Sequence, residues 1–193
     1  MEKELISTSR RKEKERCKIA YEKAREGKQV SLICSGDAGI YGMASLMYEF
    51  LPQYTDCELE IIPGITAAAS GAALLGAPLN HDFCVISLSD WLTPWEQIKK
   101  RLLAAVEGDF AIAIYNPASH KRWNYLEKAC DVLLEKADGT RACGYVENIG
   151  RKGTVIKVCS LQELRDQSVN MFTTVFIGNS KTYFNNTRQN VLK

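Results

Sequence analysis

The stretch that most constrains the fold is Ser35-Gly36-Asp37-Ala38-Gly39-Ile40-Tyr41-Gly42-Met43, where a short apolar run stops in a glycine-rich turn. Residues 30–34, before the turn, are apolar without alternation, as is typical of a strand buried on both faces of a parallel sheet. Residues 40–48, after it, repeat apolar side chains at helical spacing. Open α/β sheets bind ligands between the carboxyl end of a strand and the amino end of a helix. The stretch therefore predicts the rim of a small-molecule site.

A second turn of the same kind follows residues 59–62, which form another short apolar run. It reads Pro63-Gly64-Ile65-Thr66-Ala67 and opens a helix of small residues. Two successive turns of this composition leave room that larger side chains would fill, and a flat, wide cofactor needs such room. An ordinary turn, with Asp37 capping the helix that follows, is the alternative interpretation of the first stretch.

The rest of the chain predicts alternating helices and strands. An amphipathic, solvated helix is expected within residues 9–27, and consecutive strand-helix units through residue 75 imply a parallel sheet. Further strands are expected at residues 83–88, 109–115, 141–147, 154–159 and 173–177, and helices at 66–75, 96–106, 123–136 and 161–165. A hairpin-like connection makes 154–159 the antiparallel partner of 141–147, so the second half predicts a mixed sheet.

Composition excludes several classes of protein. The 193 residues are 46% hydrophobic and carry a formal net charge of +2, which gives no general electrostatic case for nucleic acid. The chain shows no apolar run of about 18 residues and no signal peptide, so we expect no membrane span. The seven cysteines never form C-x-x-C, which predicts reduced thiols in a cytoplasmic protein. We expect no metal site, because the two histidines have no suitable cysteine pair nearby.

Five motifs, taken in order, resemble the tetrapyrrole methylases. They are residues 35–44, then Ile62-Pro63-Gly64-Ile65-Thr66-Ala67, Ile86-Ser87-Leu88-Ser89-Asp90, Tyr115-Asn116-Pro117 and Ile177-Gly178-Asn179-Ser180. The resemblance covers residues 7–183 and is strongest to the C17-methyltransferases of cobalamin (corrin) synthesis, which act on precorrin-3B or cobalt-factor III. It implies an α/β, two-domain tetrapyrrole methylase fold, with a truncated parallel-sheet domain at 1–90, a mixed-sheet domain at 91–193 and the cofactor cleft between them.

The resemblance also implies S-adenosylmethionine as cofactor, S-adenosylhomocysteine as product and a tetrapyrrole as substrate. Methyl transfer needs little acid–base apparatus, because the sulfonium already makes the methyl carbon electrophilic, and alignment in a dry site suffices. This agrees with a sequence that lacks a Ser-His-Asp order or a P-loop. The implied cofactor contacts are Gly36, Asp37, Ala38, Ile40, Tyr41, Thr66, Ala67, Tyr115, Asn116, Gly144, Tyr145 and Thr174.

Ring contraction requires proton movements in addition to methyl transfer. The candidates follow predicted strand ends or lie in connections: Asp90, Asn116, Ser119 and Glu147. Each of them has a cap or turn role as its alternative. The candidate partners for substrate carboxylates are Lys121, Arg122, Arg151 and Lys152, and the alternative is that they are solvated surface residues. The candidates for packing on the macrocycle are Trp91 and Trp95, and the alternative is that they make core or dimer contacts.

Members of the family begin with a strand, a glycine-rich turn, a helix and a second strand that do not precede residue 7 here. Without this first strand, residues 30–34 and 59–62 are expected to lack a neighbour and to leave backbone groups unpaired. The sequence leaves three functions open. The first is C17 methylation by a protein that we expect to be a homodimer, as is common in the family. The others are methylation of another ring position and a catalytically silent protein that only binds the cofactor or tetrapyrrole.

Overall fold

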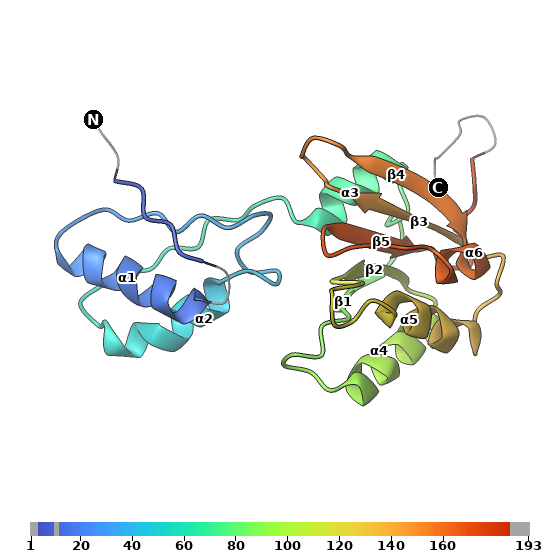
Figure 1. Cartoon of the computed structure of the whole chain (residues 1–193), viewed down its shortest axis with the longest axis horizontal. Coiled ribbons are helices and arrows are strands. Elements are labelled where there is room, and N and C mark those ends of the chain that lie inside the picture. Colours follow the sequence, from blue (N-terminus) through green and yellow to red (C-terminus); the bar gives the residue numbers. More distant parts are fainter. Residues whose placement is uncertain (1–3, 10–11, 186–193) are drawn as a thin grey trace. The chain divides into compact units, whose positions relative to one another are not determined.

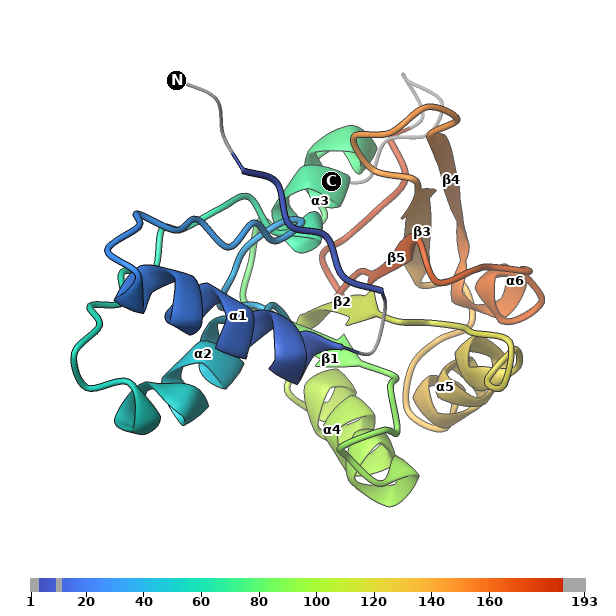
Figure 2. The same cartoon turned by 60° about the vertical axis from the view of Figure 1, so that its left-hand side comes forward.

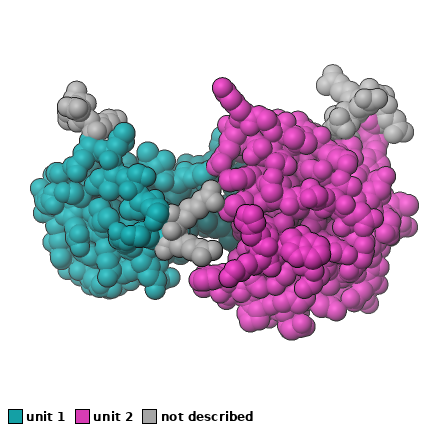
Figure 3. All heavy atoms as spheres, viewed as in Figure 1, with its two compact units in different colours: residues 1–66 teal, residues 67–193 magenta. Residues whose placement is uncertain are grey.

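The computed structural model describes residues 4–9 and 12–185, and these residues divide into two compact units. Unit 1 is Met1–Thr66 and unit 2 is Ala67–Lys193 (Figures 1 and 3). The division falls before the third helix, whereas the predicted domain boundary lies at residue 90. The helix groups with unit 2 because it packs on the sheet there.

Unit 2 is built on one mixed five-stranded sheet with the order β1-β2-β5-β3-β4. Its strands are β1 (Phe83–Ser87), β2 (Ala111–Tyr115), β3 (Ala142–Glu147), β4 (Val155–Ser160) and β5 (Thr173–Ile177). β1 and β2 are parallel, and the other neighbouring pairs are antiparallel. The predicted hairpin is confirmed, because Cys143 pairs with Cys159 in an antiparallel ladder.

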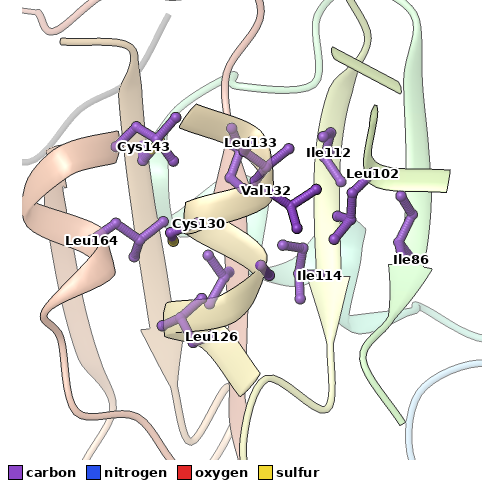
Figure 4. Packing of buried hydrophobic residues seen from close by; sticks show 14 of the residues in the cluster. Ile86, Leu102, Ile112, Ile114, Leu126, Cys130, Val132, Leu133, Cys143 and Leu164 are labelled. Carbon is purple, nitrogen blue, oxygen red and sulfur yellow. The ribbon is translucent and has the colours of Figure 1, made fainter. Parts of the chain in front are cut away.

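Helices cover both faces of this sheet (Figure 2). One face is covered by α3 (Ala67–Leu75), and the other by α4 (Trp95–Glu107), α5 (Tyr125–Leu134) and α6 (Leu161–Arg165). The larger apolar cluster lies between the sheet and the three helices, where Leu102, Ile112 and Leu133 are fully buried (Figure 4). The four helices lie within one or two residues of the predicted bounds at most ends, because their apolar periodicity matches the face they bury.

Unit 1 contains two α-helices, α1 (Glu13–Arg25) and α2 (Ala44–Phe50), and a 3-10 helix, η1 (Leu51–Gln53), within its described residues. Their core is small and centres on Cys17 and Tyr21. The Tyr21 ring stacks on Tyr54 with centroids 4.5 Å apart, and its hydroxyl donates to the Met47 carbonyl at 2.8 Å. This one buried cluster joins the helices of unit 1.

The prediction of strands at residues 30–34 and 59–62 is wrong, because neither segment forms the hydrogen-bonded ladder of a sheet. Within residues 4–9 and 12–66, no residue is assigned to a strand. Both segments are irregular, with exposed and half-buried positions alternating along them. A strand needs a neighbour whose N–H and C=O groups complete the ladder, and the described part of unit 1 supplies none.

Candidate functional site

The predicted site residues of unit 2 lie at one edge of the sheet, which we call the site edge. β1 and β2 are parallel, so both end there, after Ser87 and Tyr115. β5 is antiparallel to β2 and β3 is antiparallel to β5, so β5 begins and β3 ends at the same edge. Glu147 pairs with Thr173 at that point. The topology thus gathers Asp90, Asn116, Ser119, Glu147 and Thr174 on or next to one edge.

Tyr115 connects the site edge to the start of α3. Its hydroxyl oxygen accepts a hydrogen bond from the Ala68 backbone N–H at 2.7 Å. The N–H groups in the first turn of a helix have no partner within the helix, so a side-chain acceptor there stabilises the helix start. The small side chains of residues 67–69 permit this approach. The structure therefore brings Tyr115 together with the Ala67–Ala68 segment, as the predicted cofactor contacts require.

Asn116 is held in a rare backbone conformation beside Ser87. Its φ is 53°, in the left-handed region that Asn tolerates better than most residues. The Asn116 side-chain amide donates to the Ser87 hydroxyl at 2.9 Å, and the Ser89 backbone N–H donates to the same oxygen at 3.2 Å. Ser87 lies beside the predicted site residues and was not among them, although it belongs to one of the five motifs.

Asp90 and Ser119 belong to two loops that are fastened to each other. The Tyr125 hydroxyl donates to the Asp90 carboxylate at 2.6 Å, and the Arg122 guanidinium lies 3.5 Å from it. Arg122 also donates to the Leu88 carbonyl at 3.1 Å, while its backbone N–H donates to the Ser119 carbonyl at 3.0 Å. The bond to Asp90, with burial second, raises the pKa of Tyr125, so its phenol stays protonated at neutral pH.

Glu147 has its own partners at the site edge. Its carboxylate accepts from the Asn170 amide at 2.5 Å and from the Asn148 amide at 3.4 Å. Asn148, like Asn116, has a positive φ, here 54°. The two carboxylates among the predicted catalytic residues therefore have different partners. Asp90 accepts from Tyr125, and Glu147 accepts from Asn170.

Gly144, Tyr145 and Thr174 are buried within the sheet. A Cβ added at Gly144 would lie 3.0 Å from the Leu75 side chain and 2.9 Å from the Lys157 carbonyl, so the glycine lets α3 pack closely on β3. Tyr145 faces the other cluster, with α5 and α6, and Thr174 pairs with Val146 near the site edge. Packing explains why residue 144 is a glycine and why Tyr145 is buried. The role of both residues in binding a cofactor stays a prediction.

In unit 1, Asp37 fastens the glycine-rich turn to the second turn. One carboxylate oxygen accepts from the Gly39 N–H at 2.8 Å and the Ile40 N–H at 3.1 Å, and the other accepts from the Gly64 N–H at 2.9 Å. These bonds, the one from Gly64 foremost, lower the pKa of Asp37. The two turns also touch, because a Cβ at Gly64 would strike the Gly36 carbonyl oxygen.

The same turn leaves its other predicted contacts open to solvent. Ile40 is 41% exposed and Tyr41 is 56% exposed, and Tyr41 has a φ of 54°. α2 begins at Ala44, not at Ile40 as predicted, and no side chain caps it. The capping interpretation of Asp37 is therefore wrong, because its bonds stabilise the turn itself and its junction with Gly64.

In residues 4–9 and 12–185, no three His, Cys, Asp or Glu side chains gather as a metal ion would require, and the expectation of a metal-free site stays a prediction. Among the helices within residues 4–9 and 12–185, none could span a membrane. A surface hollow beside Arg141 and Asn179 lies at the sheet edge opposite the site edge, away from the predicted site residues.

Comparison with known proteins decides the family. The model of the tetrapyrrole (corrin/porphyrin) methylases matches residues 2–165. The chain belongs to the tetrapyrrole methylases. A probable cobalt-factor III C(17)-methyltransferase of Salmonella typhimurium is 46% identical over 94% of this chain and 76% of that protein. The cobalt-factor III methyltransferase of Priestia megaterium is 44% identical over 94% of this methylase, which spans 34% of that longer protein.

Solved structures agree with the assignment. The crystal structure of the methyltransferase CobJ superposes with a TM-score of 0.88 at 38% identity, over 97% of this tetrapyrrole methylase and 79% of that chain. The predicted family and fold class are confirmed. The prediction of a methyltransferase that uses S-adenosylmethionine is confirmed as well. The individual site residues stay predictions.

Proposed function

We propose that this methylase transfers a methyl group from S-adenosylmethionine to C17 of cobalt-factor III, or of the cobalt-free precorrin-3B, with contraction of the macrocycle, in cobalamin biosynthesis. The observation that carries the proposal is the 46% identity to the Salmonella protein over 94% of this chain. Both relatives described above are named for cobalt-factor III, which makes the cobalt form the first substrate to test.

The glycine-rich turn of unit 1 suits the methionine and ribose parts of the cofactor. Its backbone is exposed at Gly36 and Gly39, and the closeness of Gly64 to Gly36 leaves no room for a larger residue. Three backbone N–H groups already occupy the Asp37 carboxylate. We therefore assign Asp37 the role of a positioning residue, which holds Gly39, Ile40 and Gly64 in the conformation that a ligand meets.

When bound, S-adenosylmethionine supplies an electrophilic methyl group on a sulfonium, and S-adenosylhomocysteine is the neutral leaving group. The site edge of unit 2 suits such a reaction because its central groups are neutral. The Asn116 amide, the Ser87 hydroxyl and the Tyr115 phenol are polar without net charge and are held by one another or by α3. Fixed dipoles of this kind orient a substrate without repelling a cation.

Proton movement during ring contraction is assigned to the two carboxylates of the site edge. Asp90 is exposed and accepts a hydrogen bond from the Tyr125 phenol, so its carboxyl group is open to a proton on the substrate. Glu147 is half-buried and bonded to Asn170. Asn116 and Ser119 are neutral and serve orientation. We expect Asp90→Asn to lower turnover more than Glu147→Gln, with S-adenosylhomocysteine affinity unchanged in both.

The test is incubation of the chain with S-adenosylmethionine and cobalt-factor III, followed by mass spectrometry and carbon NMR of the product. Addition of one methyl group at C17 supports the proposal. A methyl group at another carbon would identify a different tetrapyrrole methylase. Binding of both ligands without any product would favour the catalytically silent protein, for which the absence of strands within residues 4–9 and 12–66 of unit 1 is the supporting observation.

We also propose that the protein works as a homodimer in the cytoplasm. The family commonly dimerises, and the cysteines of the described residues are all free thiols, as a reducing compartment maintains. Light scattering behind a sizing column tests the first point, with twice the chain mass of 21.6 kDa expected. A mass of one chain at micromolar concentration would contradict it. Fractionation of the native cells tests the second point.

A further inference from the structure

Two loops of unit 2 leave the site edge side by side and expose large apolar side chains. One loop, residues 88–94, joins β1 to α4, and the other, residues 116–124, joins β2 to α5 (Figure 1). Trp91 is 81% exposed, Leu92 is 89% exposed and Trp123 is 74% exposed. Single exposed apolar residues are common on proteins, whereas three large ones on two joined loops are the composition that a binding surface requires.

Contacts between the two loops hold together the backbone segments that carry these side chains. Asp90 precedes Trp91, Arg122 precedes Trp123, and the Arg122 guanidinium lies 3.5 Å from the Asp90 carboxylate. The bond from Tyr125 to Asp90 and the bond from Arg122 to the Leu88 carbonyl hold the same two loops. The exposed rings are thus presented by a fastened pair of loops, which reduces the entropy lost when a ligand binds.

The third tryptophan provides a contrast within the same region. The Trp95 ring packs on the Tyr125 ring, with centroids 5.1 Å apart, and lies against the large core cluster. Trp95 therefore belongs to the support of the loops and not to their exposed surface. Trp91 and Trp123, by contrast, are exposed and do not belong to this core cluster.

Positive charge borders the exposed rings. Lys121 is exposed, directly before Arg122 and Trp123, and within residues 4–9 and 12–185 it has no ion-pair partner. Lys128 lies 5.1 Å above the Tyr125 ring on the first turns of α5. A surface with indole faces and an unpaired ammonium group fits a flat, conjugated ligand that carries carboxylates at its rim.

We infer that Trp91, Leu92, Trp123 and Lys121 form a subsite for the tetrapyrrole substrate, in which the indole rings contact the macrocycle and Lys121 contacts a peripheral carboxylate. The inference rests on the proposed function, which supplies a ligand of this chemistry. The location supports it, because both loops begin at the strand ends that carry Ser87, Tyr115 and Asn116. The subsite determines affinity for the tetrapyrrole and leaves the cofactor contacts unchanged.

The test compares equilibrium binding of cobalt-factor III to the full chain and to three variants. These are Trp91→Ala, Trp123→Ala and the double variant. We expect each single change to weaken binding about tenfold and the double change to weaken it further, as the loss of a stacking platform does. Lys121→Glu weakens binding less. Phe83→Ala, at the amino end of β1, and Lys100→Glu, on α4, are matched controls and leave affinity unchanged.

Affinity for S-adenosylhomocysteine and the molecular mass are measured for the same proteins. Unchanged cofactor affinity and mass, together with weakened tetrapyrrole binding, support the subsite. Wild-type tetrapyrrole affinity in the double variant would overturn it, and so would a loss of dimer mass with tetrapyrrole binding intact, because the surface would then be a contact between copies. A wild-type chain that binds cobalt-factor III without methylating it would refute the proposed function alone, since the binding comparison still tests the subsite.

Discussion

Units 1 and 2 start from similar apolar runs, but only unit 2 converts them into a sheet. Ile112 and Ile114 of β2 are fully buried because β1 and β5 flank the strand and helices cover its faces. Ile33 and Ile62 of unit 1 lie in comparable runs and are 85% and 73% exposed. An apolar run therefore becomes a strand only where neighbours satisfy its backbone and cover its side chains.

The largest effect is expected from the core of unit 2. Phe176 is fully buried in the cluster under α3, beside Gly71. Phe176→Ala removes its contacts with α3 and leaves a cavity, so it should lower the free energy of unfolding by about 3–5 kcal/mol. Urea denaturation followed by circular dichroism measures this, with the exposed Phe172→Ala as control. A loss below about 1 kcal/mol would contradict the view that this sheet carries most of the stability.

A smaller and local effect is expected in unit 1. Tyr21→Ala removes the stack on Tyr54 and the bond to the Met47 carbonyl, at a cost of about 3 kcal/mol to the local structure. Hydrogen exchange should show faster exchange in α1 and α2 while β5 keeps its protection. Tyr48→Ala, an exposed change on α2, is the control. Equal loss of protection in β5 would show that the two units unfold together.

The Asp37 junction should respond to pH. Its folded pKa is lowered, so the bonds to Gly39, Ile40 and Gly64 are complete above the ordinary aspartate pKa of about 4 and are lost as the pH falls through the lower folded value. NMR of the three amides follows this loss. Asp37→Asn should remove the pH dependence at Gly64, 27 residues away. Asp138→Asn, which affects only its own turn at Thr140, is the matched control. Unchanged Gly64 shifts would refute the junction.

Thiol labelling compares the local opening of units 1 and 2 without a substitution in either unit. Burial raises the pKa of Cys130 to about 12 and that of Cys159 to about 11, and both lie in the core of unit 2. Cys34 and Cys57 of unit 1 are half-buried and should react first. Cys17 is fully buried in unit 1, so it reports local opening of that unit. We expect it to react before Cys143, and mass spectrometry of peptides after timed labelling would detect the opposite order.

Much of the fold of unit 2 follows from the sequence alone. The bounds of α6 and β5 are as predicted, and the hairpin of β3 and β4 is in place. These elements have clear periodicity, a capping box at Ser160 and turn residues on both sides. The predicted strands of unit 1 have the same local pattern, but the hydrogen-bonding neighbour that a strand requires is a property of the whole fold.

The site could be predicted only at the level of its motifs. Asn116 and Ser87 lie 29 residues apart in the chain, and Asp90 and Tyr125 lie 35 apart. Each pair forms because two strand ends meet at one sheet edge, and neither residue alone indicates its partner. Tyr125 lies in α5 and fits the pattern of that helix, so nothing in the sequence indicated its hydrogen bond to Asp90. The pairing of β1 with β2 would have placed the residues that follow both strands at one sheet edge, without indicating these hydrogen bonds.

The most direct test of the account is calorimetric titration of the folded chain with S-adenosylhomocysteine. Thr66→Trp, at the amino end of α3, is designed to fill the cofactor site without touching Asp37, and Phe83→Trp is its control at the opposite edge of the sheet. We expect saturable binding by one ligand per chain in the wild type and the control, and loss of binding in Thr66→Trp. No binding by a folded wild-type chain, or equal binding by all three proteins, would contradict it.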